Sequence, residues 1–136
     1  MSKGDAALLR QLASLTKDLT FMSESDYPVA PFTESAKGRP AFAAQDAVAA
    51  LKAEPNATVS EVALDNFFNG VTNEYDGQSA EAQQTARRFQ ALVKFLKDNL
   101  TDIKVYRVGD TEADVYVVGK TPTGNFAGVT TKVVET

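Results

Sequence analysis

Two segments of the chain carry hydrophobic residues at a helical period. In the first, four leucines recur at spacings of four, three and four residues: Leu8, Leu12, Leu15 and Leu19. This spacing places them on one face of an amphipathic helix. Asp5 is a good N-cap for it, and we expect the helix to end near Thr20 because Pro28 and Pro31 favour an extended chain.

The second periodic segment predicts a longer helix that begins after Ser79, a favourable N-cap. Its apolar positions recur at spacings of three, four, three and four: Ala86, Phe89, Val93, Leu96 and Leu100. Glu81 lies near the predicted N-terminus and Lys97 near the C-terminus, so both charges favour the helix dipole.

Weaker patterns separate these two helices. Residues 41–54 fit a helix, since they are rich in alanine and are followed by Pro55. Residues 58–71 fit a short strand or turn and then a helix from Asn66, capped by Asp65. The other segments are expected to be a loop followed by a short strand or extended segment over 21–32, a loop over 33–40 and a turn-rich acidic loop over 73–78.

The last 32 residues predict three short strands joined by two tight turns. The central strand, Asp114–Val118, is nearly all apolar, which is typical of a strand buried on both faces. We therefore expect one domain over residues 1–136, of the α+β class: a three-layer α/β/α sandwich with a small, mainly antiparallel sheet. The sequence stops at the end of the third strand, so Thr136 is expected close to the sheet.

The composition excludes most catalytic chemistry. The chain has no histidine and no cysteine, so zinc sites, serine–histidine triads and cysteine nucleophiles are unavailable. We expect no cofactor, no metal site of the protein's own and no enzymatic activity. No apolar run approaches the roughly 18 residues of a membrane span, and the N-terminus lacks the apolar region of a secretory signal. A cytoplasmic protein is expected.

The negative charge is unevenly distributed. The net charge is −4, and residues 53–86 hold six acidic residues with no lysine or arginine. Such a stretch steers a basic partner towards the protein, or it is a solvated acidic face that aids solubility; the sequence leaves both open. Direct binding of nucleic acid is disfavoured, because phosphate contacts need clustered basic residues.

Three motifs suggest chemistry without completing it. Gly119-Lys120-Thr121 lacks the upstream glycine and the following helix of a phosphate-binding loop. The acids of residues 110–114 lack the glycine and the distal glutamate of a calcium loop. Both are interpreted as hairpin turns. Glu24 and Asp26 form a carboxylate pair suited to acid–base catalysis, but the sequence names no substrate, and a solvated loop explains them as well.

Two blocks of sequence point to a family. Residues 21–28 (Phe-Met-Ser-Glu-Ser-Asp-Tyr-Pro) and the block 105–136 closely resemble the nuclease A inhibitor family of cyanobacteria and other bacteria. The resemblance implies an α/β/α sandwich similar to the fold of pathogenesis-related proteins. It also implies a partner, a sugar-non-specific, Mg-dependent DNA/RNA endonuclease, which the inhibitor binds in a 1:1 complex.

The same resemblance implies which residues bind the partner. In the family, the C-terminal threonine enters the nuclease active site and reaches its magnesium ion, and the glutamate of the first block contacts the same site. Those positions are Thr136 and Glu24 here, with Glu135 beside the first. A terminal threonine offers a hydroxyl and a carboxylate, hard oxygen ligands of the kind that magnesium prefers.

One part of the family pattern differs. Members carry a glutamine and a tryptophan in the loop before the long helix, where this chain has Tyr75 and Gly77. Glu74, Tyr75 or Gln78 are the candidates to take over those contacts. The departure leaves a second hypothesis open: a binding module of the same fold directed at a different protein.

Overall fold

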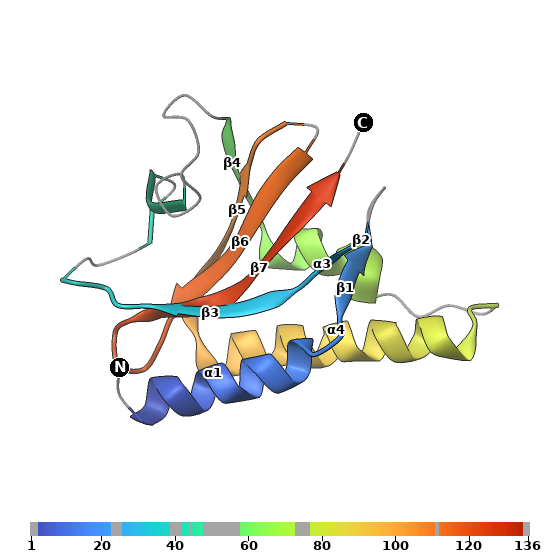
Figure 1. The fold of residues 1–136 in the computed structure, drawn as a ribbon, viewed down its shortest axis with the longest axis horizontal. Helices are drawn as coiled ribbons and strands as arrows, with labels where there is room; N and C mark the ends of the chain where they lie inside the picture. Colours follow the sequence, from blue (N-terminus) through green and yellow to red (C-terminus); the bar gives the residue numbers. More distant parts are fainter. Residues whose placement is uncertain are drawn as a thin grey trace.

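A five-stranded antiparallel sheet with helices packed on it forms the centre of the computed structural model (Figure 1). The structure describes residues 3–22, 26–38, 42–43, 45–47, 58–72, 77–110 and 112–134. The helices are α1 (Lys3–Thr16), α3 (Leu64–Thr72) and α4 (Ala80–Asn99). The strands are β1 (Thr20–Met22), β2 (Asp26–Pro28), β3 (Ala30–Glu34), β4 (Val59–Val62), β5 (Thr101–Val108), β6 (Glu112–Lys120) and β7 (Phe126–Val134).

The strand order of the main sheet is β3-β7-β6-β5-β4, and β1 and β2 form a separate two-stranded hairpin. β6 and β7 are the longest pair, in continuous antiparallel register from Glu112↔Val134 to Lys120↔Phe126. Gly128 permits their close approach, since a Cβ there would lie 1.8 Å from the Val117 carbonyl oxygen. The α+β class predicted from the sequence is confirmed.

The helices cover one face of the sheet. Figure 1 shows α1 and α4 running side by side beneath it. Alternate residues of β6 and β7 point into this layer, among them Val115, Val117 and Val129, each at most 1% exposed. They pack against buried side chains of α1 and α4: Leu8, Leu12, Phe89, Leu92 and Leu96.

The opposite face of the sheet is covered by residues around Phe42. Phe42 packs on Phe126 with ring centroids 5.6 Å apart, and both join a second core that includes Tyr106 and Val118. The Tyr106 hydroxyl donates a hydrogen bond to the Phe42 carbonyl oxygen at 3.1 Å. The expected burial of the Asp114–Val118 strand on both faces is therefore confirmed, and the sheet lies between two covering layers.

The first helix differs from its prediction at both ends. It begins at Lys3, so Asp5 lies inside its first turns instead of capping it. It ends at Thr16, where the Thr16 hydroxyl donates to the Leu12 carbonyl oxygen at 2.8 Å. Asp18 then takes a left-handed φ of 57°, which stops the helix. Leu19 still reaches the core, at 2% exposure, but from the turn that leads into β1.

The segment 21–32 holds more regular structure than predicted. The short strand is confirmed as β3, which extends to Glu34 and so shortens the predicted loop 33–40. The β1–β2 hairpin was not predicted, because three-residue strands are too short to show a period. Residues 58–71 do form a strand and a helix, but α3 begins at Leu64, which places Asp65 in its first turn instead of at its cap.

The long helix is confirmed closely. The Ser79 hydroxyl accepts a hydrogen bond from the Ala82 amide at 3.1 Å, as an N-cap should. Leu92 is fully buried although the predicted stripe omitted it, whereas Val93 is only partly buried. The two hairpin-turn interpretations are confirmed only in part. The Thr121 amide donates to the Asn125 carbonyl oxygen at 2.8 Å in the β6–β7 turn, but Gly119 and Lys120 belong to β6. Asp110 lies between β5 and β6, whereas residues 112–114 also belong to β6.

Some sequence-based expectations cannot be compared directly. Of the predicted helix 41–54, residues 45–47 are helical, and most of the remainder lies outside the described residues. The single-domain boundaries and the similarity to pathogenesis-related proteins stay predictions. None of the helices within the described ranges is long and apolar enough to cross a membrane.

Phe89 should be the side chain whose loss most disturbs the helix layer. It is fully buried, and its ring meets those of Phe21 and Phe68 with centroids 6.0 and 6.1 Å apart. We predict that Phe89→Ala lowers the free energy of unfolding by about 3–5 kcal/mol. Urea denaturation measures this, with the exposed α4 variant Gln84→Ala as a control expected to change stability by less than about 0.5 kcal/mol. Equal stability of the two variants would contradict the packing described.

Alkaline pH should destabilise the protein through Tyr106, which is buried, and Tyr116, which is half-buried. Burial raises the pKa of Tyr106, helped by Glu61 and Asp46, and burial raises the pKa of Tyr116, helped by Glu34. A pKa above the unfolded value of about 10 means that the folded state retains the proton, so stability is constant below pH 10 and falls above it. Urea midpoints measured across this range should show a shallower fall in Tyr116→Phe; an identical fall would contradict the prediction.

Candidate functional site

The β1–β2 hairpin and the last strand meet at one end of the sheet (Figure 1). The hairpin closes at the pair Met22↔Asp26, and β7 ends at Val134, opposite Glu112. The Thr131 hydroxyl donates a hydrogen bond to the Pro28 carbonyl oxygen at 3.0 Å, which fastens the hairpin to β7. Two segments about 100 residues apart in sequence are thus held side by side.

Lys132 links three elements at this end. Its Nζ donates to Glu112 Oε1 at 2.9 Å and lies 5.6 Å from the centroid of the Tyr27 ring. The first contact joins β7 to β6, and the second joins β7 to the hairpin by a cation–π interaction. The hydrogen bond with Glu112 raises the pKa of Lys132, followed by the charges of Glu112 and Asp114. The Lys132 ammonium is therefore charged at neutral pH and loses its proton only above the ordinary lysine range.

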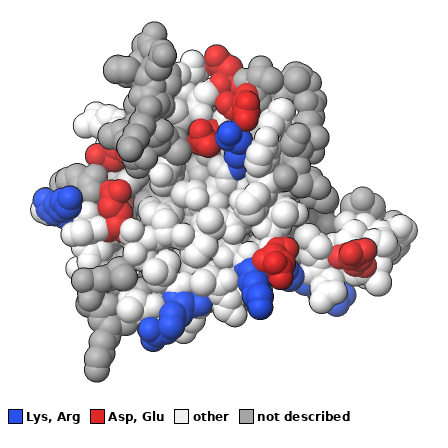
Figure 2. Space-filling model, viewed as in Figure 1, with Lys and Arg blue, Asp and Glu red and all other residues white. Residues whose placement is uncertain are grey.

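Acidic side chains dominate the charge around Lys132. Asp110 lies in the β5–β6 turn, and Glu112 and Asp114 follow at the start of β6, where Asp114 pairs across the sheet with Lys132. Figure 2 shows acidic groups gathered at this end of the molecule around one basic side chain, with basic side chains prominent on the helical side. This end of the sheet therefore presents a negative field to a partner.

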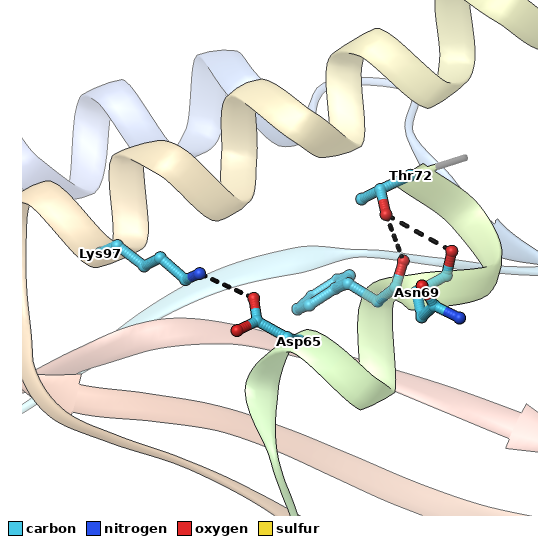
Figure 3. A network of polar contacts seen from close by, with 5 residues as sticks. Asp65, Asn69, Thr72 and Lys97 are labelled. Carbon is cyan, nitrogen blue, oxygen red and sulfur yellow. Dashed lines mark hydrogen bonds and ion pairs between the residues drawn. The ribbon is translucent and has the colours of Figure 1, made fainter. Parts of the chain in front are cut away.

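A polar network positions the end of α3 relative to α4 (Figure 3). Lys97 Nζ and Asp65 Oδ1 are 2.7 Å apart, which ties the start of α3 to the last turn of α4. The Thr72 hydroxyl donates to the Phe68 carbonyl oxygen at 3.0 Å, and Gln90 Nε2 donates to the Thr72 carbonyl oxygen at 2.7 Å. These contacts fix the position of Thr72, the last residue of α3, relative to α4.

A depression of about 310 Å³ lies between α3 and the start of α4. Its lining is mainly apolar and includes Val71, Ala82 and Phe89, with Gln78 and Ser79 at the polar side. Gln78, one of the candidate replacements in the family's interface loop, is half-buried here, and its carbonyl oxygen accepts from Gln83 Nε2 at 3.5 Å. Val71 and Gln78, on either side of the segment 73–76, therefore both line the depression.

All five residues predicted to bind a partner lie outside the described residues: Glu24, Glu74, Tyr75, Glu135 and Thr136. The structure places their neighbours in sequence. Asp26–Pro28, which follow Glu24, belong to β2. Lys132–Val134, which precede Glu135 and Thr136, belong to β7, and these two strands are in contact. The backbone of Asp26 lies in β2, so this residue of the possible carboxylate pair is part of a strand instead of a loop.

Tyr27, Glu112 and Lys132 were not among the residues predicted from the sequence to bind a partner. All three lie within the two blocks that carry the family resemblance, which is the signal that could have marked them. The pairing of Glu112 with Lys132 depends on the register of β6 against β7, which hydrophobic alternation alone leaves open.

The described residues contain no cluster of three or more carboxylates placed to hold a metal ion. What they form is an acidic sheet end with a docked hairpin, and a separate depression between two helices. Fold and site together define a small α+β protein with surfaces suited to binding another protein.

Comparison with known families gives this class a name. The chain belongs to the nuclease A inhibitor-like protein family, whose model matches residues 6–136. The match covers nearly the whole chain, including the residues between the two blocks that carry the resemblance. No curated protein sequence matches it significantly.

The contact between Lys132 and Tyr27 should be detectable in solution. We predict that Lys132→Met shifts the Tyr27 ring resonances and abolishes their salt dependence, because the neutral side chain removes the charge above the ring. NMR spectra of the variant measure this, with the exposed Lys94→Met on α4 as the matched control. Tyr27 resonances that respond equally to both substitutions would contradict the contact.

Proposed function

We propose that the protein inhibits a sugar-non-specific, Mg-dependent DNA/RNA endonuclease by binding in a 1:1 complex and blocking its active site. Membership of the nuclease A inhibitor-like family is the observation that carries this proposal, and the family match extends to the last residue of the sequence. In the proposed complex, Thr136 enters the active site and Glu24 contacts the same site.

The packing of the flanking segments supports a shared role for these two residues. Glu24 is two residues from Asp26 in β2, and Thr136 is two residues from Val134 in β7. Consecutive Cα atoms are about 3.8 Å apart, so neither residue can be far from its strand. Because Thr131 and Lys132 hold β2 against β7, one rigid end of the sheet carries both segments.

In the proposed complex, oxygen atoms of the inhibitor take the place of the substrate's phosphate oxygens at the magnesium ion. A terminal threonine carries a carboxylate and a hydroxyl, whose hard oxygens resemble those of a phosphate as magnesium ligands. A nuclease cleft that binds phosphate is basic, and the acids at residues 110, 112 and 114 give the inhibitor's end the complementary sign. These acids raise the rate of association more than they strengthen the final complex.

Secondary contacts are proposed from two further places. Glu135 lies next to Thr136, and Glu74 and Tyr75 lie in the segment that joins α3 to α4. Tyrosine is enriched among residues that dominate binding energy. We propose Tyr75 as the aromatic anchor that takes the place of the family's tryptophan.

The proposal is tested by titrating the protein into a DNA-degradation assay with a family-type nuclease. Deleting Thr136, or changing Glu24→Ala, should each weaken inhibition about 30-fold or more, as expected for a loss of about 2 kcal/mol at a central contact. Adding one glycine after Thr136 should weaken it similarly, because the carboxylate is displaced while the threonine is retained.

Asp98→Ala serves as the matched control. It removes one exposed carboxylate that forms an ion pair with Lys94 on α4, so inhibition should be unchanged. If the wild type inhibits tightly and neither the Thr136 deletion nor Glu24→Ala weakens it, the active-site mechanism is wrong.

A second candidate function rests on the departure in the interface loop. Tyr75 and Gly77 stand where the family has glutamine and tryptophan, and that difference favours a binding module directed at another protein. Recovery of a non-nuclease partner, by a protein that does not inhibit nucleases, would support this alternative over the first.

A further inference from the structure

A pocket of about 250 Å³ lies at the end of the sheet opposite the acidic site. Val118, Phe126 and Phe42 form an apolar floor, and each is at most 4% exposed. Lys104 and Lys120 form the walls, and both are half-buried. The pocket therefore combines a hydrophobic surface with two cationic groups.

The two lysines are neighbours on the same face of the sheet. Lys104 of β5 pairs with Val118 of β6, and Lys120 lies two residues beyond Val118. Such diagonal positions have Cβ atoms about 7–8 Å apart or less, within reach of each other's side chains. In the part of the chain that the structure describes, no carboxylate forms an ion pair with either ammonium. Two like charges are thus held together at the rim of an apolar floor.

The backbone around the pocket has little freedom to rearrange. The pairing of β5 with β6 is irregular between Thr101 and Lys104, and Asp102 takes a left-handed φ of 51°, a conformation that aspartate adopts more readily than most non-glycine residues. Gly119 packs tightly, since a Cβ there would lie 2.8 Å from the Leu100 Cβ. The fold therefore fixes the strand positions from which Lys104 and Lys120 extend into the pocket.

We propose that this pocket binds a small aromatic carboxylate, with the ring on Val118, Phe126 and Phe42 and the carboxylate between Lys104 and Lys120. An apolar cavity of about 150 Å³ is enough for benzene, so 250 Å³ accommodates one ring with its carboxylate. Two lysines offer up to six N–H donors, more than one carboxylate needs. Asp102 also lines the pocket, so its negative charge offsets one of the two lysines and leaves one net positive charge, which matches a single carboxylate better than a polyanion such as nucleic acid.

The proposed site is independent of the nuclease-inhibitor function. β7 runs from Phe126 at the pocket to Val134 at the opposite end, and eight residue steps of about 3.4 Å separate them by about 27 Å. A ligand in the pocket therefore does not occupy the end of the molecule that carries Thr136. Failure of either proposal leaves the other intact.

The experiment is a titration of the full chain with benzoate, followed by NMR and isothermal titration calorimetry. Saturable binding is expected, with shifts centred on Val118, Gly119 and Phe126. Lys104→Met and Lys120→Met should each weaken binding about five-fold or more, the effect of losing one partly exposed ion pair. Lys104→Arg should retain binding, and unchanged thermal midpoints will show that the variants are folded.

Two further probes separate the contributions of charge and ring. Benzamide, a neutral molecule of the same shape, should bind much more weakly than benzoate if the lysines recognise the carboxylate. Inorganic phosphate should also bind more weakly if the apolar floor takes part. Equal binding of benzoate and benzamide, equal binding of benzoate and phosphate, or benzoate shifts that persist unchanged in both methionine variants would each overturn the proposal.

Discussion

The pairing of β6 with β7 is the interaction on which the rest of the structure depends. It runs without interruption through nine residue pairs, and both strands are buried on two faces. Val117 and Val129 pack against the helices, while Val118 and Phe126 pack against the layer around Phe42. Slipping the register by one residue would exchange these two sets of side chains and expose both cores. The register therefore fixes the helices, the second core and the position at which β7 ends.

The same register explains how the two ends of the sheet differ in charge. At one end it sets Lys132 opposite Asp114 and beside Glu112. This one lysine therefore lies near both carboxylates, and it also contacts the hairpin through Tyr27. At the other end it sets Lys120 opposite Phe126, and the pairing of β5 with β6 adds Lys104 beside the same apolar floor. The acidic end suits a basic protein cleft and the basic end suits a small anion, so one strand pairing separates two proposed binding surfaces.

Sequence patterns predicted the parts of this fold that rest on local chemistry. The Ser79 cap, the period of α4 and the alternation in the last three strands depend on residues that are close in sequence, and the structure confirms them. The end of α1 was mispredicted because Asp18, in a left-handed conformation, stops the helix before Leu19, whose spacing continues the leucine period. The β1–β2 hairpin was missed because its three-residue strands show no period, and its position depends on the contacts of β2 with Thr131 and Lys132 of β7. The residues of the site were harder to predict, because they come together only through tertiary structure. Family resemblance supplied Glu24 and Thr136, whereas Tyr27, Glu112 and Lys132 become neighbours only once the register is known.

The central claim is that the sheet end formed by β7 and the hairpin delivers Thr136 to the metal ion of a nuclease. Paramagnetic relaxation in a complex with a nuclease whose magnesium is replaced by manganese tests this most directly, since the effect falls steeply with distance from the metal. The account predicts severe broadening of Thr136 and Glu24 resonances, weaker broadening at Tyr27 and Lys132, and none at Lys104 or Lys120. Broadening centred elsewhere, with Thr136 unaffected in a saturated complex, would contradict it.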